Sequence, residues 1–495
     1  MLRPRFPYVV AAAIIMLFTG APAQALSRPM DPVILTGADL PELPGIAPGE
    51  LVAFRWSGDW EQIPVQVDER AVINFTSVYN GNRTYGNLSR LDYVDSGTFT
   101  GPDPNPLLDA DDEIVFMAAD SGGKCPSYFR PPAGARLEPC IEITLTDPLG
   151  GAPGHVYLFV RNGTLDPSAG VFYVDYNFGL LSGDYKSTYK LAKGPNPENT
   201  TVTTDYYRRH FSDRWKCDGL NIYAGGATGV DILDRHKNLF APGYCGRSEN
   251  TFSAAEGAFI INKNGPVRAI RGYVGANSGP RTQRTHHYYA QREDITTHLR
   301  VHSIPAIMDF FDYSPAAAGM TYHNNNAPSG VVIDGVPDTV APGRIQWELV
   351  KGPQGSLAML YSFTTDLPSL NALTYYLDNI NPPETQCTGD AFAYGSSGTF
   401  ILQGIPNTDP AGGAFNILQV LRTMYYLPPG ATTEQVEALK NANDHPLEVT
   451  VSIVEPVPVP LPLGWLWALA ALLLLAGAGF LKGAVIGFGK TKTSD

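Results

Sequence analysis

Alternation of polar and apolar residues dominates the chain and predicts β-strands. Residues 62–68, 142–146 and 449–453 alternate, and a period of two places successive side chains on opposite faces of a strand. Residues 155–160, His-Val-Tyr-Leu-Phe-Val, are almost continuously apolar, which indicates a more deeply buried strand. Turn-forming clusters such as residues 147–151, Asp-Pro-Leu-Gly-Gly, separate such segments. We therefore expect an all-β body built as an antiparallel β-sandwich.

A single helix is well signalled within this body. Thr432 and Gln435 have the spacing of a capping box, and residues 434–442 contain good helix formers. A weak break in the strand pattern lies at residues 162–170. We expect two β-domains, a smaller one over residues 26–165 and a larger sandwich over residues 166–455.

The N-terminus has the layout of a secretory signal peptide. Arg3 and Arg5 precede an apolar run over residues 8–18, and residues 23–25, Ala-Gln-Ala, form a small-x-small cleavage site. The apolar run is too short to span a bilayer. We expect export with removal of residues 1–25, and an uncleaved anchor is the alternative.

The C-terminus has the layout of a membrane anchor. Residues 463–481 carry no charge, and at about 1.5 Å per residue they are just long enough for a hydrocarbon core of about 30 Å. Trp465 and Trp467 lie at one edge, and the basic residues of segment 482–495 follow the other. Because basic residues stay in the cytoplasm, we predict a transmembrane helix with the body outside and a cytoplasmic tail.

The proline-rich segment before this span, residues 456–462, predicts an extended spacer. A short proline motif, one apolar span and a basic end resemble the PEP-CTERM type of C-terminal sorting signal. The resemblance covers about 40 of 495 residues. It implies that an exosortase-like enzyme processes the tail and that the protein is sorted to the bacterial surface or extracellular matrix. The tail departs from such signals because it continues through residues 483–487, and a plain single-pass anchor is the alternative.

Charge and composition exclude one large class of partner. The chain has 48 acidic and 35 basic residues, and its net charge is -13. Affinity for nucleic acid requires clustered lysine and arginine, so we expect no nucleic-acid partner. The 50 glycines and 42 prolines agree with many short strands joined by turns.

The five cysteines are expected to form disulfides in an exported protein. Pairing by proximity along the chain predicts Cys125–Cys140 and Cys217–Cys245, which leaves Cys387 as a free thiol. Residues 228–237 lie between the second pair and contain two aspartates beside Arg-His-Lys. We expect this segment to be a pinned, ion-paired surface loop.

An acidic segment over residues 103–113 predicts a calcium site. It carries six oxygen-bearing side chains in turn-forming sequence, and calcium takes six to eight oxygen ligands. The alternative is an acidic turn whose aspartates cap backbone amides. The predicted ligands are Asp103, Asn105, Asp109, Asp111 and Glu113.

Residues 285–302 hold four of the nine histidines. A hairpin turning at Arg292 and Glu293 would place His287 opposite His298, and a shift of one residue would substitute His286. The same hairpin would place Tyr289 opposite Thr296 and Thr285 opposite Arg300.

Such a histidine face fits zinc binding, acid–base catalysis or sugar binding. The alternative is a solvent-exposed polar face without function. The candidate catalytic residues are His287, His298, Arg300 and Tyr289. The candidate ligand-binding residues are His286, Tyr288 and His302.

These features predict an exported surface or matrix protein that binds polysaccharide or acts structurally. The alternative is a surface carbohydrate-active enzyme, a lyase or hydrolase, that uses the histidine face. The sequence contains no phosphate-binding glycine loop, serine nucleophile elbow or His-Glu-x-x-His motif.

Overall fold

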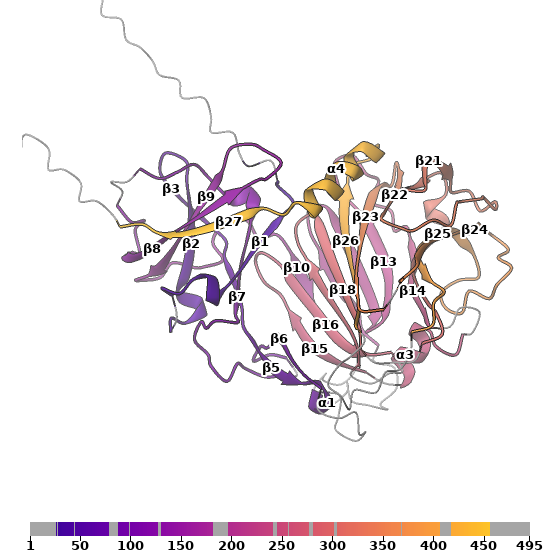
Figure 1. Ribbon diagram of the computed structural model, residues 1–495, viewed down its shortest axis with the longest axis horizontal. Helices are drawn as coiled ribbons and strands as arrows, with labels where there is room; N and C mark the ends of the chain where they lie inside the picture. The colour runs from indigo at the N-terminus through magenta and orange to yellow at the C-terminus, as the bar shows by residue number, and fades with distance from the viewer. Residues whose placement is uncertain are drawn as a thin grey trace, which may run out of the picture.

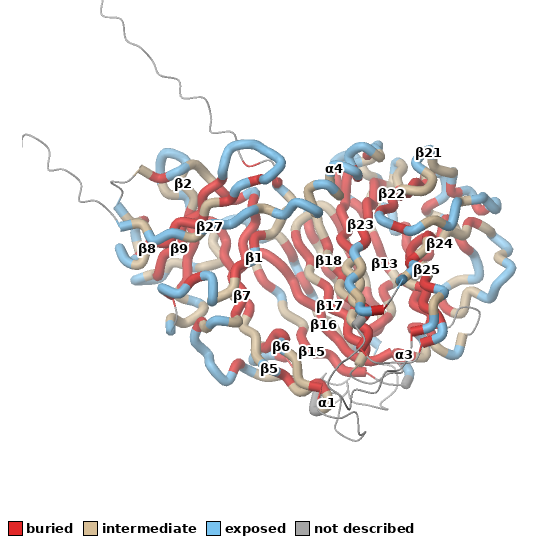
Figure 2. The backbone as a smooth tube through the Cα atoms, in the orientation of Figure 1, coloured by how far each residue is buried: buried red, intermediate tan, exposed pale blue. Residues whose placement is uncertain are grey.

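The computed structural model describes residues 26–455, with gaps at residues 27, 44, 79–87, 99, 127–129, 182–196, 241–244, 256, 277–280, 301–303, 368 and 406–416. Two bodies of β-sheet lie side by side (Figures 1 and 2). The predicted leader, proline spacer, apolar span and basic tail lie outside the described residues, as does His302. Within the described part of the chain, no helix has the length and apolar character needed to cross a membrane.

The smaller body, at the left in Figure 1, consists of two sheets and a hairpin. Its five-stranded sheet has the order β27-β8-β9-β2-β3 and contains β2 (Leu51–Trp56), β3 (Trp60–Ile63), β8 (Ala135–Thr146), β9 (Gly154–Arg161) and β27 (Glu448–Ile453). Its three-stranded sheet has the order β1-β7-β4 and contains β1 (Pro32–Thr36), β4 (Gln66–Asp68) and β7 (Glu113–Met117). The hairpin pairs β5 (Arg70–Asn74) with β6 (Ser89–Tyr93). Apolar residues of both sheets, including Leu51, Ile114 and Leu158, form one core.

The last described strand returns to the first domain. β27 pairs with β8, with Val451 opposite Ile143, and appears in Figure 1 as a yellow strand beside purple ones. The end of the segment predicted to form the second domain, residues 448–453, therefore completes a sheet of the first domain instead.

The described residues of the larger body form three sheets. The nine-stranded sheet has the order β15-β16-β17-β18-β26-β23-β22-β20-β21 and contains β15 (Gly257–Lys263), β16 (Ala269–Gly275), β17 (Thr282–Tyr288), β18 (Arg292–Arg300), β20 (Thr321–Asn324), β21 (Ala327–Val332), β22 (Trp347–Gly352), β23 (Gly355–Thr365) and β26 (Ile417–Leu427). One four-stranded sheet contains β10 (Asp175–Asn177), β11 (Thr200–Thr203), β12 (Tyr207–Asp213) and β13 (Lys216–Ile222). The other has the order β14-β19-β25-β24 and contains β14 (Leu233–Phe240), β19 (Ile307–Tyr313), β24 (Ala372–Asn379) and β25 (Ala393–Ile401).

Both four-stranded sheets cover the same face of the nine-stranded sheet. Tyr207 of β12 stacks on Tyr426 of β26, with ring centroids 3.7 Å apart. His236 of β14 lies 3.0 Å from a guanidinium nitrogen of Arg422, also on β26. The largest apolar cluster of the described residues fills the space between these sheets. The expected antiparallel β-sandwich is confirmed.

Helix α4 (Thr433–Asp444) begins with the predicted capping box. The Thr432 hydroxyl accepts from the Gln435 amide, and the Gln435 side chain accepts from the Thr432 amide. Val436 packs with Trp347 and Leu360 on the outer face of the nine-stranded sheet. The other described helical segments are short: α1 (Phe75–Val78), α3 (Glu249–Ala255), η1 (Gly37–Asp39), η2 (Pro48–Glu50), η3 (Ala118–Asp120) and η5 (Pro315–Ala317).

The predicted strands form, but the structure differs from the expectations for two segments. Residues 62–68 are split between β3 and β4, because Pro64 lacks a backbone donor and the chain changes sheet there. Residues 228–237 are not a surface loop throughout, because β14 begins at Leu233 and buries Lys237 completely.

The disulfide pairing differs from the prediction. Cys245 is bonded to Cys387, which had been expected to be free. Cys217 is a free thiol buried in the core between the sheets. Cys125 and Cys140 are both buried free thiols in one apolar cluster. Proximity along the chain failed because folding brings together two cysteines 142 residues apart.

We expect the Cys387→Ser variant of the full-length chain to unfold at a lower urea concentration. A cross-link between residues this far apart restricts the unfolded chain and stabilises the native state by roughly 4–5 kcal/mol in the chain-entropy model. A reductant should lower the wild-type midpoint towards that of the variant and leave the variant unchanged. A wild-type midpoint insensitive to reductant would contradict the pairing.

Candidate functional site

The predicted histidine hairpin forms, but in a different register. Arg292 already pairs as the first residue of β18, so the turn lies before it and not at Arg292 and Glu293. His287 therefore lies opposite Asp294, and His298 lies opposite Gln283. The predicted pairs, and the alternative pair with His286, do not form.

Strand alternation separates the adjacent histidines of β17. His286 faces the interior of the sandwich, where its Nδ1 lies 2.9 Å from Glu293 Oε1 and its Nε2 lies 3.1 Å from the Tyr273 hydroxyl. Tyr288 is buried on the same side. Burial lowers the pKa of His286 to about 4, so the imidazole is neutral at pH 7. This site is completely enclosed, and we assign it a structural role.

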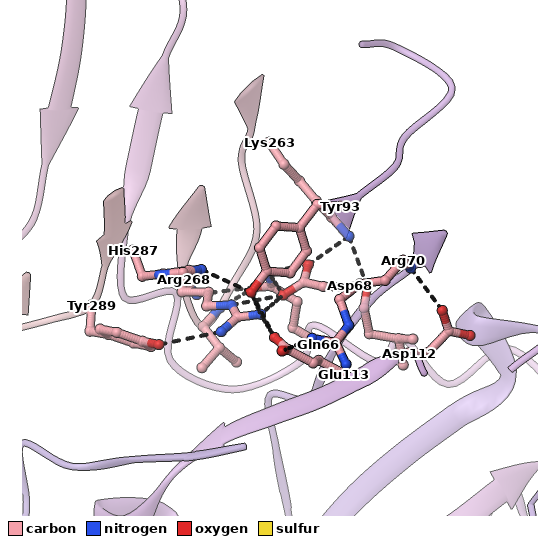
Figure 3. A network of polar contacts seen from close by, with 12 residues as sticks. Gln66, Asp68, Arg70, Tyr93, Asp112, Glu113, Lys263, Arg268, His287 and Tyr289 are labelled. Carbon is pink, nitrogen blue, oxygen red and sulfur yellow. Dashed lines mark hydrogen bonds and ion pairs between the residues drawn. The ribbon is translucent and has the colours of Figure 1, made fainter. Parts of the chain in front are cut away.

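His287 faces the opposite way, towards the first domain, and joins the polar network in Figure 3. Its Nε2 lies 2.9 Å from the Tyr93 hydroxyl, which donates to Glu113 Oε2 at 2.8 Å. Burial and the nearby Arg268 lower the pKa of His287 to about 4. Because the Tyr93 proton goes to Glu113, the neutral imidazole donates from Nε2 to the Tyr93 oxygen without adding charge.

Arg268 is the centre of this network. Its guanidinium donates to Asp68 at 2.8 Å and to Glu113 at 2.5 Å. Lys263 binds Asp68 at 2.7 Å, and Arg70 binds Glu113 at 2.7 Å. Despite burial, which opposes the change, the neighbouring cations hold the pKa values of both carboxyls below their ordinary range.

The network joins the two domains. Asp68, Arg70 and Glu113 belong to the first domain, whereas Lys263 and Arg268 belong to the second (Figure 3). The Gln66 side-chain oxygen also accepts from the backbone amides of Val267 and Arg268, at 3.1 and 3.0 Å. Opposite charges at this contact are matched and hydrogen-bonded. The arrangement supports a role in holding the two domains together, and a catalytic role for His287 stays a prediction.

The remaining predicted residues lie at different places. The Tyr289 hydroxyl contacts Arg268 at 3.4 Å, at the edge of the polar network between the two domains. Arg300 donates to Gln283 at 2.8 Å, and burial with Arg90 lowers its pKa to about 10. Burial and Arg300 lower the pKa of His298 to about 4. A catalytic role for these residues stays a prediction.

The structure brings together part of the predicted set of calcium ligands in the acidic segment. Carboxylate oxygens of Asp109, Asp111 and Asp112 lie within 4.8 Å of one another. Asp112 had not been among the predicted ligands, whereas the predicted Glu113 turns away to bind Arg268. The Asn105 amide donates to Asp109 at 2.7 Å. The Asp103 carboxylate accepts the backbone amide of residue 105, as expected for a capped turn. Calcium binding here stays a prediction.

A surface pocket on the first domain was not found from the sequence. It has a volume of about 490 Å³ and lies between the β2–β3 hairpin and residues 130–133. Trp56 and Trp60 are half-buried, with ring centroids 5.1 Å apart and ring planes at 79°. Trp60 Nε1 donates to the Arg130 carbonyl at 2.7 Å, which fixes the indole. The charged side chains of Asp59 and Arg130 are exposed at the pocket.

The sequence carries a signal for this pocket. Residues 56–60, Trp-Ser-Gly-Asp-Trp, place two tryptophans on either side of a tight turn, so their side chains meet across a hairpin. The opposing wall comes from a proline-rich segment some 70 residues later in the chain. Only folding brings the two walls together.

Known proteins do not identify the chain. It matches no family model and no curated protein. Three solved structures that resemble it are a glycosyl hydrolase family 38 protein from Enterococcus faecalis, the Slr1438 protein from Synechocystis, and a provisionally assigned aldose 1-epimerase from Escherichia coli K12. Their TM-scores are 0.39, 0.27 and 0.26, with 8%, 10% and 10% identity. The matches cover 87%, 48% and 51% of this chain and 46%, 97% and 100% of those chains. At these scores they establish neither a family nor an activity.

We expect Arg268→Met to destabilise the protein by about 3–5 kcal/mol, because it leaves Asp68 and Glu113 buried without their shared cation. Urea unfolding of the full-length chain measures the effect. Arg55→Met is the matched control, because Arg55 pairs with Glu61 at the exposed surface, and such pairs contribute less than about 1 kcal/mol. Equal effects of the two substitutions would contradict the docking role.

We expect the stability difference between wild type and His287→Gln to narrow as the pH falls. The folded pKa of about 4 lies below the unfolded value of about 6.5. Stability contributed by neutral His287 is therefore fully present above about pH 6.5 and is lost as the pH falls towards about 4. Urea unfolding of both proteins at several pH values between these limits measures the gap, and a constant gap would contradict the assignment.

Proposed function

We propose that the protein is exported to the bacterial surface or extracellular matrix and binds polysaccharide there through the pocket of Trp56 and Trp60. The single observation that supports this proposal is the tryptophan pair at a surface cavity flanked by Asp59 and Arg130. The pocket lies at the surface, whereas most residues of the predicted histidine face are buried inside polar networks.

The pocket has the chemistry that a sugar ring requires. Indole faces offer large apolar contact area at a low cost in side-chain entropy, and they suit the C–H face of a pyranose. The carboxylate of Asp59 and the guanidinium of Arg130 supply an acceptor and several donors for hydroxyl groups. The volume of about 490 Å³ lies within the range of about 300–1,000 Å³ typical of small-molecule sites.

The pocket is also partly preorganised. Trp60 packs edge-on against Phe54, Tyr157 and Phe159 at centroid distances of 6.3, 5.2 and 5.4 Å. Together with the hydrogen bond to the Arg130 carbonyl, these contacts restrict the ring before any ligand arrives. A ring that is already ordered loses little entropy on binding, which favours affinity.

The predicted termini support the location. A leader over residues 1–25 and an apolar span over residues 463–481 are what an exported, anchored or sorted protein requires. The disulfide Cys245–Cys387 agrees with an oxidising compartment. Exosortase-like processing of the tail remains part of this proposal.

We expect full-length protein to be retained on the host's own extracellular polysaccharide, and Trp56→Ala to weaken this binding at least tenfold, or about 1.4 kcal/mol. Trp60→Ala should have a similar effect. Phe392→Ala is the control, because Phe392 is an aromatic residue 43% exposed on the other domain. Binding by both tryptophan variants at wild-type strength would contradict the pocket assignment.

The same incubation tests the enzyme alternative. New polysaccharide chain ends that disappear in a folded His298→Ala variant would favour a lyase or hydrolase that uses the β17–β18 residues. Retention of protein without new chain ends would favour binding alone.

A further inference from the structure

Lys237 and Asp312 form a charged pair that is sealed from solvent. Their strands, β14 and β19, are antiparallel neighbours, with Lys237 opposite Phe310 and Arg235 opposite Asp312. The two residues are thus diagonal neighbours on one face, within reach of a long side chain. Lys237 Nζ contacts Asp312 Oδ2 directly, and both side chains are 0% exposed.

Several other polar groups surround this contact. The Ser396 hydroxyl donates to Asp312 Oδ1, and the Gln386 side-chain oxygen lies 3.4 Å from Lys237 Nζ. Carboxylate oxygens of Asp234 and Asp390 lie within 4.8 Å of an Asp312 oxygen. Burial raises the pKa of Asp312 to about 6, although Lys237 opposes the change. The Asp312 carboxyl is therefore protonated more readily than that of an exposed aspartate, while it stays in contact with the Lys237 amine.

An ion pair in such a place carries a large desolvation cost, which its Coulomb attraction repays only in part. Converting the two charges into one neutral amide would remove that cost. Holding the two reacting groups in contact also replaces a bimolecular encounter by an intramolecular one, which is worth effective molarities of about 10⁵–10⁸ M in well-oriented cases.

We propose that Lys237 and Asp312 condense to form an intramolecular amide bond that joins β14 and β19. The ammonium first transfers a proton to the carboxylate, and the free amine then attacks the carboxyl carbon. A bond forms between Lys237 Nζ and Asp312 Cγ, and one carbon–oxygen bond breaks. The oxygen leaves as water with two of the three ammonium protons, so the reaction needs no oxidant, reductant or other reactant.

A second lysine–aspartate pair in the chain provides an internal comparison. Lys263 lies 2.7 Å from Asp68, but Lys263 is 18% exposed. Asp68 is also held by Arg268 and Gln66, and the surrounding cations keep its pKa below the ordinary value despite burial. That carboxylate stays charged and that amine stays hydrated, so the same condensation is not expected there.

The test is a mass measurement on full-length protein purified from an exporting host, after reduction of the disulfide and unfolding. Relative to the Lys237→Arg variant, wild type should be lighter by one water molecule beyond the change due to the substitution. Tryptic digestion should yield one branched peptide containing residues 237 and 312. An amine-reactive reagent applied to the unfolded chain should modify Lys263 and not Lys237.

The Asp312→Asn variant gives a second test, because it is expected to form the cross-link and not to lose it. Its amide can react in the same way with loss of ammonia, so its final cross-linked peptide should be identical to that of wild type. Wild-type protein with its full calculated mass and a reactive Lys237 would overturn the proposal and leave the contact as a buried ion pair. The result does not depend on polysaccharide binding.

Discussion

Charge buried between β-sheets is the constraint on which this structure depends. The two domains meet across Arg268, whose guanidinium binds carboxylates from two strands of the first domain. The sandwich of the second domain follows the same principle, with ion pairs such as Arg271–Glu198 at 2.7 Å, which is fully buried, and Arg284–Asp309 at 2.6 Å, which is largely buried. An isolated buried charge would be prohibitively unstable, so each pair requires both partners in place. Such interiors specify one arrangement of sheets, because a shifted register would leave several charges unmatched.

This constraint also separates structural polar residues from those available to a ligand. His286 and His287 are neighbours in the sequence, yet His286 lies inside the sandwich and His287 lies at the contact between the domains. Both are neutral because burial lowers their pKa values to about 4. The tryptophan pocket has the opposite character, since its polar groups are exposed and its apolar rings are fixed from behind. The histidine cluster is thus largely buried, whereas the aromatic hairpin lies at the surface.

Local patterns predicted local structure well. Alternation located β8 and β27, a continuous apolar run located β9, and the capping box located the start of α4, because these features depend on neighbouring residues. The histidine register failed because it depends on where the turn falls, and one misplaced turn changes every cross-strand pair. The segment around His236 and Lys237 was expected at the surface because it lies between two cysteines, Cys217 and Cys245, that were predicted to pair. In this protein many charged side chains lie in the interior, so a charged residue in the sequence does not indicate a position exposed to solvent. The tryptophan pocket and the Cys245–Cys387 bond join segments distant in sequence, which no local pattern encodes.

If the proposed anchoring and polysaccharide binding hold, the return of β27 to the first domain would set the path of mechanical force. Tension between a surface anchor beyond β27 and a polymer held at the β2–β3 hairpin would enter and leave through one five-stranded sheet. The load would pass from β3 through β2, β9 and β8 to β27, across successive ladders of backbone hydrogen bonds. The larger sandwich would stand beside this path and bear little of the force. The stability of the larger sandwich and the resistance of the whole molecule to pulling could then change independently of each other.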